Sequence, residues 1–137
     1  MTSAPAWERR ALQFCVVLGG CVPVGAGLAG VWLGPRFAGP VGDPSVSLDS
    51  HFSYLSGLLL AIGLAFWSTL PAIEDRGGRF RLLTAIVFVG GLARATTLLR
   101  FGLPDAPMLF GLTMELIVTP ALAFWQARLA RASAPTM

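Results

Sequence analysis

The chain has 137 residues, of which 55% are hydrophobic and 12% are charged, about half the charged share of a soluble domain. So few polar side chains cannot cover so many apolar ones, and the composition therefore excludes an ordinary soluble fold and predicts one domain that lies in a membrane. The net charge of +3 would suit nucleic acid as a partner, but the arginines are spread over the connecting segments, which excludes the clustered basic face that phosphate binding needs.

Four apolar runs follow one another along the chain, at residues 11–33, about 52–71, 82 to about 99, and about 107–125. Each is close to the ~20 residues that an α-helix needs to cross ~30 Å of hydrocarbon. A helix satisfies its own backbone hydrogen bonds inside lipid, so the runs predict an all-α integral membrane protein with four spanning helices. The connections are short, which makes consecutive helices antiparallel neighbours and predicts an up-down four-helix bundle.

The arginines predict the orientation of this bundle. Seven of them fall before the first run, in the connection at 73–81 or at the end of the fourth run, whereas Arg36 and Arg100 fall on the opposite side. Because cytoplasmic loops carry the excess of basic residues, we expect both termini in the cytoplasm. Arginine without lysine, together with abundant alanine, glycine and proline, is typical of a GC-rich bacterial genome, so we expect a multi-pass protein of the bacterial inner membrane.

Motifs for catalysis or for a cofactor do not occur in the sequence. It has no glycine-rich phosphate loop, no zinc-spaced set of cysteine and histidine, and no nucleophile elbow. Cys15 and Cys21 lie six residues apart in one apolar run, which on a helix separates their α-carbons by roughly 9 Å, too far for an undistorted disulfide. With a single histidine, we expect no metal and no cofactor.

Two charged residues interrupt the apolar runs, and their positions predict an ion pair. Arg94 lies about six residues before the end of the third run, or ~9 Å along a helix, and Glu115 lies about eight residues into the fourth run, or ~12 Å. On antiparallel neighbours these depths match, in the outer half of the bilayer. An unpaired arginine at the centre of a membrane helix costs ~2.5–3.5 kcal/mol, and two parallel hydrogen bonds to a carboxylate would offset that cost.

Small and polar residues share the helix faces that carry the two charges. Glycines lie about one turn before each charge at three-to-four spacing, and a threonine lies one turn after the arginine. The glycines would leave room for a partner side chain or a small ligand. A histidine and a tyrosine near the start of the second helix would reach the same outer end. The predicted ligand-binding residues are therefore His51, Tyr54, Gly90, Gly91, Arg94, Thr97, Gly111 and Glu115.

Three classes of function remain open on these residues. In the first class, the protein binds a small amphiphile, such as a lipid or a quinone, beside the pair. In the second class, it is an accessory or structural subunit of a larger membrane complex, and the pair only fixes helix register. The third class is a small membrane enzyme or proton relay that uses Glu115 or His51 for acid–base chemistry. We expect binding or structural support rather than catalysis. The expected partners are membrane lipids, a quinone or other amphiphile, and a membrane protein or second copy of this chain.

Several short motifs follow in a recognisable order over roughly residues 47–131: SHFSYLSGLLLAIGLAF, IEDRGGRFRLL, VFVGGLAR and MELIVTPALAFWQARLA. On these motifs the chain resembles a family of small bacterial four-helix membrane proteins classed as a domain of unknown function. Family members often carry a basic residue where this chain has Ser53. The plan is also similar to that of DoxX-like four-helix proteins, some of which are associated with quinone-linked oxidoreductases. The family resemblance implies a four-helix bundle, no defined activity, and characteristic positions at His51, Gly57, Gly90, Gly91, Arg94 and Glu115.

Overall fold

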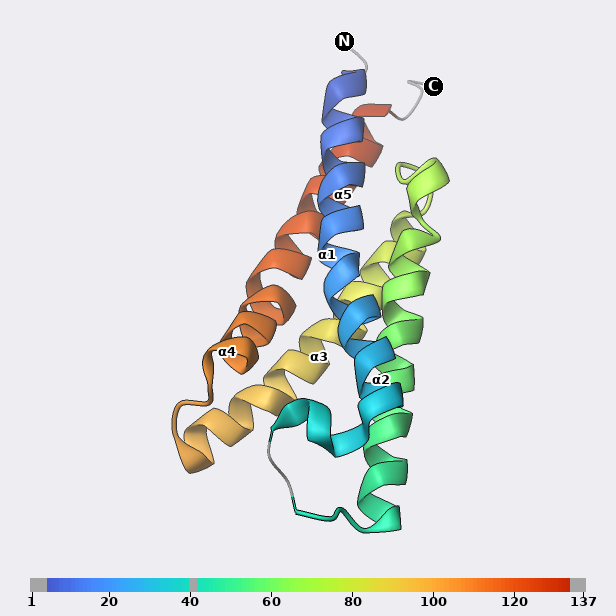
Figure 1. Cartoon of the computed structure of the whole chain (residues 1–137). Coiled ribbons are helices and arrows are strands. Elements are labelled where there is room, and N and C mark those ends of the chain that lie inside the picture. Colours follow the sequence, from blue (N-terminus) through green and yellow to red (C-terminus); the bar gives the residue numbers. More distant parts are fainter. Residues whose placement is uncertain (1–4, 40–41, 134–137) are drawn as a thin grey trace. The chain divides into compact units, whose positions relative to one another are not determined.

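The computed structural model describes residues 5–39 and 42–133, and every regular element in this part of the chain is helical, as the sequence predicts. Short 3₁₀ turns follow the first two long helices, and a π-helical turn divides the last one. Figure 1 shows the elements, which in chain order are α1 (Ala6–Leu33), η1 (Gly34–Ala38), α2 (Val46–Trp67), η2 (Leu70–Ala72), α3 (Gly77–Phe101), α4 (Ala106–Thr113), the π turn η3 (Met114–Val118) and α5 (Thr119–Ser133).

Particular residues set the ends of these helices. The side-chain oxygen of Ser45 accepts a hydrogen bond from the Leu48 N–H at 3.2 Å, and this cap starts α2 six residues before the predicted apolar run at 52. The predicted run continues to 71, whereas α2 ends at Trp67. Pro71 has no N–H with which to continue the helical ladder, so the chain passes there into the η2 turn.

Within residues 5–39 and 42–133, four helical segments are long and apolar enough to cross a membrane, namely those that begin with α1, α2, α3 and α4. Many of their large apolar side chains are exposed, and Trp32, Leu99 and Phe101 are 88%, 84% and 84% exposed. In water so much exposed apolar surface would be an aggregation hazard, whereas lipid solvates it. The helices therefore indicate a multi-pass membrane protein.

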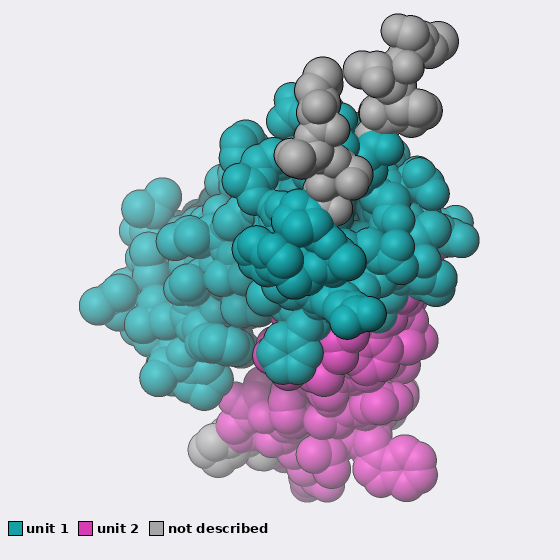
Figure 2. Space-filling view, turned by 90° about the horizontal axis from the view of Figure 1, so that it is seen from above, with its two compact units in different colours: residues 1–16, 69–137 teal, residues 17–68 magenta. Residues whose placement is uncertain are grey.

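The chain divides into two compact units, which Figure 2 draws in separate colours. Unit 1 consists of residues 1–16 and 69–137, and unit 2 consists of residues 17–68. Helix α1 contributes its first turns to unit 1 and its remainder to unit 2. Whether the two units make one domain and one up-down bundle, as the sequence predicts, stays a prediction.

In unit 2, α1 and α2 approach each other closely at glycines. A Cβ added at Gly27 would lie 2.6 Å from the backbone nitrogen of Leu60, so only a hydrogen atom fits there. At the far end of α2 the indole N–H of Trp67 donates to the carbonyl of Val17 at 3.2 Å. The two helices thus pack backbone against backbone, which is how membrane helices gain contact area when lipid provides no hydrophobic driving force between them.

In unit 1, the first turns of α1, the connection around η2 and the end of α5 are held together by side-chain hydrogen bonds to the backbone. The amide of Gln13 donates to the carbonyl of Leu70 at 2.7 Å, and that of Gln126 donates to the carbonyl of Ile73 at 2.8 Å. These bonds satisfy carbonyls that the turn leaves free. The apolar side chains buried in the same unit are Leu12, Val16, Ile73, Phe80, Leu83 and Leu129.

A charged cluster ties the same three segments together. Glu8 of α1 accepts hydrogen bonds from the indole N–H of Trp125 at 3.1 Å and from the guanidinium of Arg128, both on α5. Arg9 forms an ion pair with Glu74 at 3.1 Å. The side chain of Trp125 therefore has a protein partner at the end of the fourth span.

Candidate functional site: an arginine–glutamate pair within the membrane spans

Arg94 of α3 and Glu115 of η3 form a bidentate ion pair. The Arg94 Nε donates to Glu115 Oε2 at 3.0 Å, and Nη2 donates to Oε1 at 2.9 Å. Both residues lie inside helical segments that are long and apolar enough to span a membrane. The predicted pairing of these two charges is thus confirmed, and the two parallel bonds fix the guanidinium in one orientation.

A short turn explains why the charges meet. Helix α3 ends seven residues after Arg94, and α4 begins nine residues before Glu115, which corresponds to ~10 Å and ~14 Å along the two helices. Only residues 102–105 separate the helices, so the chain turns back at once and carries α4 and α5 along α3 (Figure 1). Gly102 follows the last residue of α3 with a φ of 92°, a backbone conformation that residues with a side chain rarely adopt.

The guanidinium of Arg94 is only partly satisfied by the protein. Its Nη1 donates to the sulfur of Met108 at 2.9 Å, and a thioether is a weak acceptor. Three of the five N–H groups of the side chain thus have partners, and the other two have none among the described residues. The side chain of Arg94 is 37% exposed and that of Glu115 is 17% exposed, so the open edge of the pair belongs to the arginine.

A π-helical turn presents Glu115 to α3. The N–H of Thr119 bonds to the carbonyl of Met114, five residues back, and the Thr119 hydroxyl donates to the same carbonyl at 2.8 Å. Pro120 follows directly; in a regular α-helix its ring would clash with the carbonyl four residues back. The wider turn relieves that clash and changes the rotation of the helix next to Glu115. Such π turns occur frequently at functional sites.

Two adjacent glycines on α3 have different surroundings. A Cβ added at Gly91 would lie 2.7 Å from Leu116 Cδ2 and 2.9 Å from Glu115 Cβ, whereas one added at Gly90 would meet nothing within 4 Å. Gly111 on α4 is also open to an added Cβ. Gly91 therefore allows the helices to approach closely at the pair, while Gly90 and Gly111 leave space at the helix surface.

The predicted site residues belong to both units of the chain. Thr97 is exposed on α3, one turn beyond Arg94. His51 and Tyr54 lie in the first turns of α2, where both are exposed, and they belong to unit 2 rather than to the unit that holds the pair. Their membership of the site stays a prediction.

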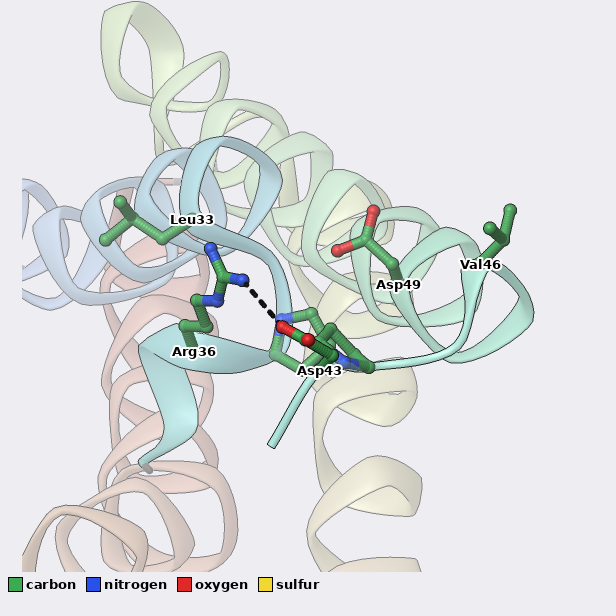
Figure 3. A pocket seen from close by; sticks show the side chains of 7 residues that line it. Leu33, Arg36, Asp43, Val46 and Asp49 are labelled. Carbon is green, nitrogen blue, oxygen red and sulfur yellow. Dashed lines mark ion pairs between the residues drawn. The ribbon is translucent and has the colours of Figure 1, made fainter. Parts of the chain in front are cut away.

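Two of the hollows in the described residues lie away from the pair, and neither has Arg94 or Glu115 in its lining. One lies in unit 2 between the ends of α1 and α2, where Arg36 pairs with Asp43 at 3.6 Å near Asp49 (Figure 3). Both side chains of that pair are mostly exposed. The other hollow lies in unit 1 between α3 and α5.

In the described part of the chain, no three or more His, Cys, Asp or Glu side chains are grouped closely enough to hold a metal ion.

Sequence reasoning missed two features of unit 1. It did not predict that the sulfur of Met108 would contact the guanidinium of Arg94. It also did not predict the hydrogen bond that the indole of Trp125 donates to Glu8. The second contact joins residues 117 positions apart, and no local pattern marks such a pairing.

The helices and the pair define a class of protein: an all-helical, multi-pass membrane protein in which a bidentate arginine–glutamate pair joins two antiparallel spans. The family model for the Domain of unknown function DUF4345 matches residues 11–126, and the chain belongs to this family. The resemblance seen in the sequence motifs, to a family of unknown function, is thereby confirmed. No curated protein and no solved structure matches the chain.

Proposed function

We propose that this protein binds the polar group of a small amphiphile, a lipid or a quinone, at Arg94. The protein lies in the bacterial inner membrane with both termini in the cytoplasm, and the pair lies in the outer half of the bilayer. The asymmetric distribution of arginines along the sequence supports this orientation.

The single observation that carries the proposal is the incomplete hydrogen bonding of a fixed, partly exposed guanidinium. Two N–H groups of Arg94 have no partner among the described residues, and a third has only the sulfur of Met108. Lipid offers no water to such donors, so an N–H group that faces lipid without a partner is costly. A phosphate, carboxylate or quinone carbonyl oxygen would satisfy these donors and would compete readily with a thioether.

The surroundings of the pair suit such a ligand. Glu115 already holds the guanidinium in place, so a ligand would immobilise little additional side-chain freedom on binding. Gly90 and Gly111 add open surface on the helices that carry the pair. The exposed Thr97 offers a hydroxyl one turn away from Arg94.

A second candidate function is that of an accessory or structural subunit of a larger membrane complex. The observation that favours it is the close packing at Gly91, where Leu116 and Glu115 leave no room for a methyl group. In that case the pair fixes the register of α3 against the last helix, which is the best-attested use of buried ion pairs. An acid–base enzyme is less favoured, because both oxygens of Glu115 already accept hydrogen bonds from Arg94.

A ligand-dependent melting experiment tests the proposal. The purified protein in detergent is titrated with a short-chain quinone and with phospholipids, beside a double variant in which Arg94→Met is combined with Glu115→Leu. A ligand at ~100 times its Kd stabilises the folded state by about 2.7 kcal/mol, which a thermal melt resolves easily. We expect one of these amphiphiles to raise the melting temperature of the wild type more than that of the folded double variant.

The two candidate functions give different results in this experiment. If no amphiphile stabilises the wild type more than the double variant, the binding proposal fails. If, in addition, Glu115→Gln alone strongly destabilises the protein, the structural function is the one that remains.

A further inference from the structure

The hollow between α3 and α5 ends at an arginine. It has a volume of about 340 Å³ and opens to the surface of unit 1, and its lining is almost entirely apolar. It is lined by Arg81, Thr84, Ala85, Phe88, Pro120 and Ala123.

The shape of the hollow follows from the residues on its two walls. On α3 the lining residues recur at three- to four-residue spacing, so they form one stripe that extends ~10 Å along the helix. The facing helix contributes Pro120 and Ala123, which are too small to fill the space between the helices. Thr84 donates its hydroxyl to the carbonyl of Phe80 at 2.9 Å, so its one polar group is already satisfied. The result is an apolar slot parallel to the helices.

Arg81 stands where the apolar span begins. It directly precedes the run that starts at residue 82, its side chain is exposed, and it forms no ion pair with another described residue. Its Nη1 lies 3.4 Å from the position that a Cβ of Gly77 would occupy, one turn toward the start of α3. The guanidinium thus extends away from the apolar span, as basic side chains do at a membrane boundary. Glu74, a carboxylate in the preceding connection, is paired with Arg9.

We propose that this hollow and Arg81 form a binding site for one anionic phospholipid, with part of an acyl chain in the slot and the phosphate on the guanidinium. An acyl chain lies parallel to spanning helices and meets only apolar atoms in the slot. The unpaired positive charge at the end of the slot coincides with the depth of the phosphate groups, and basic residues at this depth attract anionic lipids. The site is separate from the proposed amphiphile site, because Arg81 and Arg94 are ~20 Å apart along α3.

The test compares the affinity of the purified full chain for phosphatidylglycerol and phosphatidylcholine, measured by native mass spectrometry from detergent micelles. The first variant, Arg81→Gln, removes the charge, and the second, Ala85→Leu, fills the slot at an exposed position of α3. Arg10→Gln is the matched control, because Arg10 is also exposed but does not line the hollow.

We expect the wild type to retain one phosphatidylglycerol and to prefer it to phosphatidylcholine. Arg81→Gln should weaken phosphatidylglycerol binding about tenfold, as expected when a charge-assisted hydrogen bond is lost, and should abolish the preference. Ala85→Leu should weaken the binding of both lipids. Arg10→Gln should behave as the wild type.

Three results would overturn the proposal. Equal effects of Arg10→Gln and Arg81→Gln would mean that only the general positive charge attracts the lipid. An unchanged affinity for both lipids in Ala85→Leu would mean that no acyl chain occupies the slot. A change from dimer to monomer in Ala85→Leu would assign the hollow to a second copy of the chain. None of these results depends on the Arg94–Glu115 pair.

Discussion

The substitution Gly91→Ala tests the close approach of the helices at the ion pair, and Gly90→Ala is its matched control. The two positions are adjacent on α3, so both substitutions give the same gain in helix propensity, roughly 0.5–1 kcal/mol in a helix interior. They differ in what the new methyl group meets. At Gly90 it meets nothing within 4 Å, and at Gly91 it would meet Leu116 and Glu115.

The size of the effect follows from the distances. Two carbon atoms pack best at ~3.5–4.0 Å, and the new Cβ at Gly91 would lie 2.7 Å from Leu116 Cδ2 and 2.9 Å from Glu115 Cβ. The leucine methyl can rotate away, but the Glu115 Cβ is fixed to the helix backbone and moves only if the helices separate. Overpacking of this kind costs ~1–3 kcal/mol. Because the propensity gain cancels between the two variants, we expect Gly91→Ala to be less stable than Gly90→Ala by about that amount.

The assay is the unfolding free energy of each variant in mixed detergent micelles, titrated with a denaturing detergent and followed by tryptophan fluorescence. The wild type should lie below Gly90→Ala, and Gly91→Ala should be equal to the wild type or less stable. Equal stability of the two variants would refute the close contact between Gly91 and the helix that carries Glu115.

Further predictions concern the pair, the orientation and the π turn. Glu115→Gln should destabilise the protein by at most ~3–5 kcal/mol, since Arg94 is partly exposed, and adding Arg94→Met should recover much of the loss; strictly additive losses in a double-mutant cycle would show that the side chains do not meet. Reporters fused after Arg131 or within 73–81 should face the cytoplasm, and one between the first two helices should face the other side; external labelling at 73–81 would contradict this. Pro120→Ala restores an N–H and should weaken the coupling energy of the pair, whereas an unchanged coupling would mean that the π turn does not position Glu115.

The spans and the pair could be predicted from the sequence because both depend on local patterns. An apolar run of spanning length specifies a helix, and two short-linked helices are antiparallel, so residue counts from the turn at 102–105 place Arg94 and Glu115 at matching depth. The helix ends were less predictable. They depend on single residues, such as the cap Ser45 and Pro71, and the length of an apolar run does not take these residues into account.

The details of the site depend on helix rotation, which the sequence pattern resolves poorly. Gly90 and Gly91 were placed on one stripe with Arg94, but successive residues on a helix lie about 100° apart, so only one of them can face the partner helix directly. The π turn shifts the rotation again at Glu115. Pro120 is the signal in the sequence for a distortion of the helix, and the structure shows that distortion as a π turn in which Thr119 bonds to Met114.

The contact between Met108 and the guanidinium could not be predicted for the same reason. Met108 lies seven residues before Glu115, two turns along the helix, and its sulfur reaches Arg94 only because the side chain extends across the gap between α3 and α4. Because a thioether is a weak acceptor, Nη1 is the bonded donor of Arg94 with the weakest partner. An oxygen of the proposed ligand would replace the Met108 sulfur at this donor.

The central claim, that Arg94 held by Glu115 binds an amphiphile, is tested most directly by native mass spectrometry of the protein purified gently from its own membrane. Three forms are compared: the wild type, Arg81→Gln, and Arg81→Gln combined with Arg94→Met and Glu115→Leu, so that both variants lack the proposed phospholipid site at Arg81. We expect a bound lipid or quinone mass on the wild type that persists in Arg81→Gln and disappears from the folded triple variant. Retention of that mass by the triple variant, or its absence from Arg81→Gln, would contradict the claim.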